Sequence, residues 1–177
     1  MRLIKYYIIA FFIFTHTPSW ADDNASKPAP TRTELALFAM GLVGAIYKPG
    51  GDNPNTGMDC SGFVKYVFGE VAGLKLPHNA LAMSKISAEI SKSDLHPGDL
   101  VFFKTTKTAF SHVGIYLGEN RFIHAASSKT GIVMISHLDD MYWGNRFNGA
   151  RRLLNPIVAL SSKATASAAI NLPSFSE

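Results

Sequence analysis

Residues 112–117 and 121–125 alternate between apolar side chains and a second set that includes two histidines. A period of two is typical of a β-strand whose two faces meet different surroundings. The three residues between the segments, Gly118-Glu119-Asn120, are typical of a turn. The two segments are therefore predicted to form an antiparallel hairpin. A hairpin here indicates that the second half of the chain contains a β-sheet.

Further strands are predicted around this hairpin, over residues 100–104, 132–136 and 148–154. In the first half, apolar residues recur at helical spacing, which predicts helices over residues 33–43, from about residue 59 onward, and over residues 80–90. Helices in the first half and consecutive strands in the second predict an α+β domain with a mostly antiparallel sheet.

The first 21 residues have the pattern of a secretory signal peptide. Arg2 and Lys5 accompany a short apolar run over residues 8–14, and Ser19-Trp20-Ala21 offers small residues at the −3 and −1 positions of a cleavage site. A transmembrane anchor is the alternative, but the run is shorter than the ~20 residues that span a bilayer. We therefore expect an exported protein, periplasmic or secreted, with no stable membrane anchor after cleavage.

The remaining chain divides into three parts by composition. Residues 22–32 are polar and carry prolines, which predicts a linker. Residues 33–156 hold all the predicted elements and form one domain, and residues 157–177 are small and polar, which predicts a flexible tail. Without residues 1–21 the chain has 15 basic and 13 acidic side chains, a formal charge of +2, so nothing supports nucleic-acid binding.

Cys60 is the only cysteine in the sequence. It precedes apolar residues at helical spacing, so the thiol is expected in the first turn of a helix. The helix dipole and unpaired backbone N–H groups there favour a thiolate, which predicts a thiol pKa below the ordinary value of about 8.5 and a nucleophilic role. The alternative is a buried, inert cysteine that packs as a small apolar side chain.

His112 and His124 lie on the two strands of the predicted hairpin. Strand alternation and pairing place both side chains on one face of the sheet, a geometry that suits a general base and the residue that orients it. The alternative places both histidines on a solvated sheet face. One cysteine and two histidines could also bind zinc, but their spacing matches no zinc motif, so neither a metal nor a cofactor is predicted.

These segments resemble the signature blocks of the NlpC/P60 family of cell-wall peptidases, and the resemblance extends from about residue 34 to residue 154. The four main blocks are Asp59-Cys60-Ser61-Gly62-Phe63-Val64, Pro97-Gly98-Asp99-Leu100-Val101-Phe102-Phe103, Ser111-His112-Val113-Gly114-Ile115-Tyr116-Leu117-Gly118 and Phe122-Ile123-His124-Ala125. Residues 47–51 and 142–152 add weaker similarity. Four blocks in one order are more specific than any single tetrapeptide.

The resemblance implies a papain-like fold in which the helix that carries the nucleophile packs on an antiparallel sheet. It implies Cys60 as nucleophile, His112 as general base and His124 as the residue that orients the His112 ring. It also implies that three residues line the substrate site: Tyr47, Asp59 and Ser61. For Asp59, a helix cap is the alternative role.

The expected substrates are peptidoglycan stem peptides or cross-links, cut at an amide bond by a monomeric enzyme. One departure from the family pattern concerns specificity: many relatives have Leu-Pro-Arg-Thr-Ser where this chain has Leu76-Pro77-His78-Asn79-Ala80. Two alternatives stay open at this point. The same three residues would also serve an acyltransferase, and a module that binds peptidoglycan without cutting it would keep the same fold.

Overall fold

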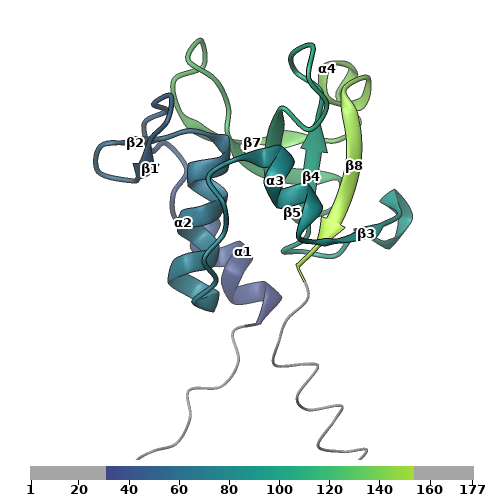
Figure 1. The fold of residues 1–177 in the computed structure, drawn as a ribbon, viewed down its shortest axis with the longest axis horizontal. Helices are drawn as coiled ribbons and strands as arrows, with labels where there is room; N and C mark the ends of the chain where they lie inside the picture. The colour runs from purple at the N-terminus through teal and green to yellow at the C-terminus, as the bar shows by residue number, and fades with distance from the viewer. Residues whose placement is uncertain (1–30, 154–177) are drawn as a thin grey trace, which may run out of the picture.

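The computed structural model describes residues 31–153, which form a six-stranded antiparallel sheet with helices against it (Figure 1). The strand order is β3-β8-β4-β5-β6-β7. The strands are β3 Ala88–Ile90, β4 Leu100–Phe103, β5 His112–Gly118, β6 Arg121–Ala125, β7 Val133–His137 and β8 Phe147–Arg152. A small ribbon of β1 Asp52–Asn53 and β2 Gly57–Met58 stands apart from this sheet. The predicted α+β class and mostly antiparallel sheet are confirmed.

Within residues 31–153, four α-helices accompany the sheet: α1 Arg32–Met40, α2 Cys60–Ala72, α3 Ala80–Lys85 and α4 Met141–Gly144. A short 3₁₀ turn, Lys92–Asp94, precedes β4. Helices α1 and α2 pack together (Figure 1). Helix α2 also packs on β5 and β6. This places the first residue of α2 close to the sheet.

Thr31 begins the described chain by capping α1. Its hydroxyl oxygen accepts the Glu34 N–H at 3.1 Å, and the Glu34 carboxylate accepts the Thr31 N–H at 2.7 Å, which is a reciprocal capping box. The helix therefore begins at Arg32. The predicted signal peptide (1–21), most of the linker and the tail (157–177) lie outside the described residues.

The sheet is buried on both faces. Towards α1 and α2, side chains such as Phe63, Val113 and Ile115 form one apolar core. On the opposite face, residues such as Phe103 and Phe122 form a second core. The predicted alternation is confirmed, but the idea that the histidine face is solvated is wrong, because the second core covers it.

The predicted helix over residues 80–90 is wrong in its second half. Helix α3 ends at Lys85, and residues 88–90 instead form β3, which pairs with β8 at the edge of the sheet. Sheet pairing has overridden the local helical pattern there. The other predicted strands agree with the structure to within one or two residues, the normal uncertainty of element ends.

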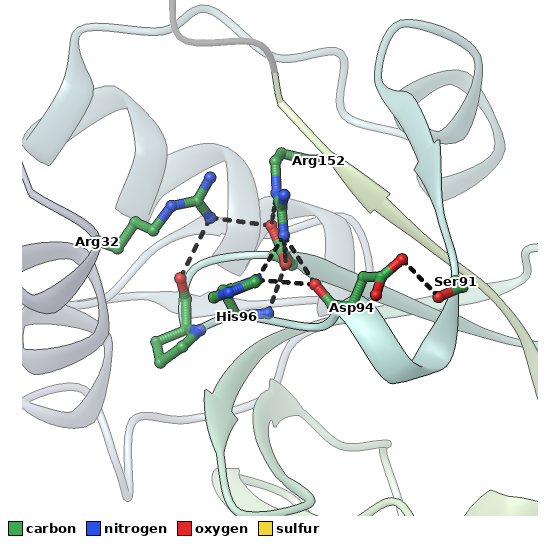
Figure 2. Close-up of polar contacts among 7 residues, drawn as sticks. Arg32, Ser91, Asp94, His96 and Arg152 are labelled. Atoms are coloured by element: carbon green, nitrogen blue, oxygen red, sulfur yellow. Dashed lines mark hydrogen bonds and ion pairs between the residues drawn. The ribbon is translucent and has the colours of Figure 1, made fainter. Parts of the chain in front are cut away.

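Asp99 links the first helix to the last strand through Arg32 and Arg152, whose side chains are labelled in Figure 2. Its carboxylate is fully buried and accepts hydrogen bonds from Arg152 Nε at 2.8 Å, Arg152 Nη2 at 2.7 Å and Arg32 Nη1 at 2.9 Å. The His96 backbone N–H donates a further bond at 2.7 Å. Both ends of the described chain are thereby attached to one buried charge. Within residues 31–153, no helix is long and apolar enough to cross a bilayer.

Candidate active site

Cys60 is the first residue of α2, as the sequence predicted. Asp59 caps this helix, because its Oδ1 accepts the Gly62 N–H at 2.7 Å. The other oxygen, Oδ2, accepts the Gly50 N–H at 3.0 Å. A Cβ on Gly62 would collide with the Gly51 carbonyl oxygen, so glycine lets the loop before α2 lie directly on its first turn. These contacts fix the position of the thiol.

The two predicted histidines meet on one face of the sheet. His112, the first residue of β5, places Nε2 2.8 Å from Nδ1 of His124 on β6. His112 is 5% exposed and His124 is fully buried. A Cβ on Gly114 would lie 3.2 Å from the His124 Cβ and 2.7 Å from the Phe122 ring, so glycine at this position lets the two strands carry these rings side by side.

The histidine pair continues to a third side chain that the sequence did not single out. His124 Nε2 lies 3.0 Å from the hydroxyl oxygen of Ser136 on β7. Ser136 is 7% exposed. Three consecutive strands thus contribute one hydrogen-bonded row, His112 to His124 to Ser136. Only the register between β6 and β7 brings Ser136 there, and no sequence pattern marks it.

Aromatic rings enclose the histidines. The Trp143 ring stacks on His112, with centroids 5.3 Å apart and an angle of 27°, and meets His124 edge-on at 4.7 Å. Phe122 stacks on His124 from its own strand, at 4.8 Å. Packing on several sides holds the imidazole planes and keeps water from them.

Burial decides the charges of these groups. It lowers the pKa of His112 to about 4, against a smaller upward effect of Asp59. Burial and the neighbouring His112 also lower the pKa of His124. Both rings are therefore neutral at neutral pH.

The thiol differs from its predicted state. Burial raises the pKa of Cys60 to about 11, although a hydrogen bond from the Val113 backbone N–H favours the thiolate, and the charge of Asp59 raises the pKa further. The predicted lowering of the thiol pKa is thus wrong, because desolvation outweighs the helix start. At rest, a neutral thiol lies beside a neutral imidazole.

Cys60 lies where two open pockets meet. One pocket, of about 630 Å³, is lined by Cys60, His112, Ser136 and Trp143, among others. The second pocket, of about 380 Å³, adjoins it, and Tyr47, Cys60 and Ser111 line both pockets. A chain laid through both pockets would pass directly over the thiol.

The second pocket collects the residues predicted to line a substrate site, Tyr47, Asp59 and Ser61, together with His78. Asp59 Oδ1 accepts a hydrogen bond from Ser61 Oγ at 2.9 Å and lies 3.0 Å from His78 Nε2. Burial raises the pKa of Asp59, but the bonds from Gly62, His78 and Ser61 outweigh it and hold that pKa below 3.8. Burial also raises the pKa of Tyr47, and the nearby negative charges of Cys60 and Asp59 raise it further.

Sequence reasoning noted His78 as a departure from the family pattern but gave it no contact. Its partner lies 19 residues earlier in the chain, and only the folded loop before α3 brings the two together. No group of three or more histidine, cysteine or acidic side chains within residues 31–153 is arranged to hold a metal ion.

A cysteine at the start of a helix that packs on an antiparallel sheet, with a histidine on that sheet lining the same pocket, is the arrangement of the papain-like class of thiol proteins. The family model described as "NlpC/P60 family" matches residues 44–152. The chain belongs to the NlpC/P60 family.

Among the proteins similar to the chain are two curated relatives and one solved structure. The Escherichia coli "Murein DD-endopeptidase MepS/Murein LD-carboxypeptidase" is 43% identical over 133 residues, which cover 75% of this chain and 69% of the relative. The Bacillus subtilis "Gamma-DL-glutamyl hydrolase" is 39% identical over 74% of this chain, but the match spans only 32% of that relative's length. A crystal structure of a Bacillus cereus NlpC/P60 family protein is 29% identical with a TM-score of 0.66, over 72% of this chain and 41% of the other.

Proposed function

We propose that this protein is an exported cysteine endopeptidase that hydrolyses amide bonds in peptidoglycan stem peptides or cross-links. Membership of the NlpC/P60 family supports the class, and the Escherichia coli relative is named for acting on murein. The observation that carries the proposal is the row that joins His112 to His124 beside Cys60, at the meeting point of two pockets.

In this mechanism, His112 Nδ1 takes the proton of the Cys60 thiol as sulfur attacks the carbonyl carbon of the scissile bond. Nε2 is the ring nitrogen held by His124, so Nδ1 is the one left for this transfer. Because both groups are neutral at rest, proton transfer and attack are coupled steps of general-base catalysis. The product of attack is a tetrahedral oxyanion.

The oxyanion is stabilised by the Cys60 backbone N–H at the start of α2 and by the Tyr47 hydroxyl, both at the wall of the pocket. His112 then gives its proton to the leaving amine, the C–N bond breaks and a thioester remains on Cys60. Water, deprotonated by His112, attacks the thioester carbonyl. The C–S bond breaks, His112 returns its proton to the sulfur, and the product leaves as a carboxylic acid that releases its proton to solvent.

Export rests on the predicted signal peptide, residues 1–21. Cleavage after Ala21 would release the mature protein into the periplasm or the medium. N-terminal sequencing of the mature protein tests this part: a chain that begins at Asp22 supports export, and one that begins at Met1 in the cytoplasmic fraction refutes it.

Mass spectrometry of purified peptidoglycan fragments tests the activity. The fragments are incubated with the wild type and, in parallel, with Cys60→Ala. New free carboxylate and amine termini, made only by the wild type, support the hydrolase and identify the bond. Addition of an amine to the new terminus instead would indicate acyl transfer, and intact fragments bound equally by both proteins would indicate a binding module.

A further inference from the structure

The hydrogen-bonded row on the sheet ends at the Ser136 hydroxyl, and this hydroxyl determines which ring nitrogens of His124 and His112 carry a proton. A neutral imidazole carries one proton, on either nitrogen, and its other nitrogen accepts. Two such rings in a row have two self-consistent arrangements, with the protons pointing towards Cys60 or away from it. Only one of these leaves a base next to the thiol.

The productive arrangement follows from the distances. For His112 Nδ1 to take a proton, the ring proton must sit on Nε2 and point to His124 Nδ1, 2.8 Å away. His124 must then carry its proton on Nε2, which needs an acceptor. Ser136 Oγ, 3.0 Å from that nitrogen, is the partner that the structure gives it. A hydroxyl accepts readily and can turn its own proton elsewhere.

The burial of His124 makes the Ser136 hydroxyl important as a hydrogen-bond acceptor. His124 is fully buried, with Phe122 and Trp143 against its ring. An Nε2–H without an acceptor in that position is costly, so loss of the hydroxyl would favour the opposite arrangement, with the proton on His124 Nδ1. The charged or titratable groups near His112 are Cys60 and Asp59 on the α2 side and His124 on β6.

We propose that Ser136 is a positioning residue that holds the protonation state of His124 and, through it, keeps His112 Nδ1 ready to accept the thiol proton. This inference rests on the proposed peptidase function. Ser136 also lines the pocket on the His112 side of the thiol, which leaves its own proton free to point into that pocket.

The first test compares Ser136→Thr with Ser136→Val. The two new side chains have nearly the same shape, but valine has a methyl group where threonine has the hydroxyl. The threonine variant is expected to keep kcat within about threefold, while the valine variant loses roughly 10- to 100-fold in kcat with little change in KM, since a buried donor loses its acceptor. Equal losses in the two variants, or no loss in either, would overturn the proposal. Ser136→Ala, which adds no bulk, replaces the valine variant if thermal unfolding shows that valine disrupts the fold.

The second test reads the imidazoles without turnover. Nitrogen-15 NMR of histidine-labelled protein in the Cys60→Ala background at neutral pH should show His124 protonated at Nε2. The same spectrum of Cys60→Ala with Ser136→Val should show the proton moved to Nδ1 or divided between both nitrogens. An unchanged His124 in this variant overturns the proposal. A changed His124 in this variant, found together with a wild-type protein that cleaves no peptidoglycan, upholds the role of Ser136 and refutes the peptidase function instead.

Discussion

Cys60 combines a helix start, which favours a thiolate, with burial, which opposes it more strongly. A pKa of about 11 means that the thiolate fraction rises about tenfold with each pH unit across the neutral range. The thiol therefore stays protonated and weakly reactive until a substrate binds and His112 takes its proton. In an oxidising compartment, this protection also slows oxidation of the sulfur.

The pH dependence of alkylation tests this state. Cys60 is the only cysteine, so intact mass reports its reaction with iodoacetamide directly. The rate is expected to rise continuously to about pH 10, without a plateau near neutrality, because the thiol pKa is raised. The urea-unfolded chain is the control and should level off above an ordinary thiol pKa of about 8.5. A plateau below about pH 7 in the folded protein would instead show a stable thiolate–imidazolium pair.

His78 provides a second prediction at the scale of single residues. It lies 3.0 Å from Asp59 in the second pocket, so loss of this contact should loosen a carboxylate that also caps α2. His78→Leu is expected to lower kcat/KM by roughly 3- to 10-fold, the effect of losing one partly exposed hydrogen bond to a charge. His78→Gln, which retains a donor, is the matched control and should stay near the wild type. If the leucine variant is fully active, the contact has no part in the reaction.

At the scale of the elements, α2 depends on one close contact in its first turn. A Cβ on Gly62 would overlap the Gly51 carbonyl group, whereas the nearest atom to a Cβ on Gly69 in the same helix is the Leu74 carbonyl oxygen at 3.9 Å. The first glycine is required by packing, and the second only lowers helix propensity. These two positions separate the packing of the helix from its intrinsic stability.

Gly62→Ala is therefore expected to destabilise the protein by about 2–3 kcal/mol through overpacking. Gly69→Ala should stabilise it by about 0.5–1 kcal/mol, since alanine is the better helix former. Urea unfolding followed by circular dichroism measures both changes. Equal effects of the two substitutions would contradict the close contact at the head of α2.

The elements also show how far the sequence leads. The face shared by His112 and His124 follows from a period of two, which any paired strand must obey. The start of α2 at Cys60 follows equally from local spacing and an aspartate cap. Ser136 and the contact of His78 do not, because they depend on how distant segments meet. The thiol pKa was predicted wrongly for the same reason, since burial belongs to the fold and not to the helix start.

At the scale of the whole molecule, stability depends on the buried Asp99. Burial raises the pKa of this carboxyl, but Arg152, the His96 N–H and Arg32 lower it more, so it lies below the ordinary value of 3.8. The unfolded chain therefore binds this proton more readily than the folded protein. The resulting stabilisation is fully present above about pH 4 and is lost as the pH falls towards the folded pKa.

Asp99→Asn is expected to destabilise the protein by about 1.5–3 kcal/mol, because two partly exposed arginines lose their charged hydrogen-bond partner. Below about pH 4 the stability of the variant should also fall less steeply with pH than that of the wild type, because the variant lacks this titrating carboxyl. Glu119→Gln is the control, since Glu119 is 82% exposed in its pair with Arg121 and should have little effect. Equal stability of the Asp99 and Glu119 variants, measured by urea unfolding, would contradict this role.

The shared carboxylate has a further consequence for how the domain can be connected. Arg32 and Leu153 line one cavity with Phe68 and Ala72 near the end of α2, while Cys60 begins that helix, about 18 Å away at 1.5 Å per residue. The way in which the two ends of the described chain are connected should therefore have little effect on the surroundings of Cys60. A circular permutant that joins residue 153 to residue 31 by a short bridge and opens the chain at an exposed loop elsewhere would place the bridge far from the two pockets that Cys60 lines. We expect such a permutant to keep the site intact.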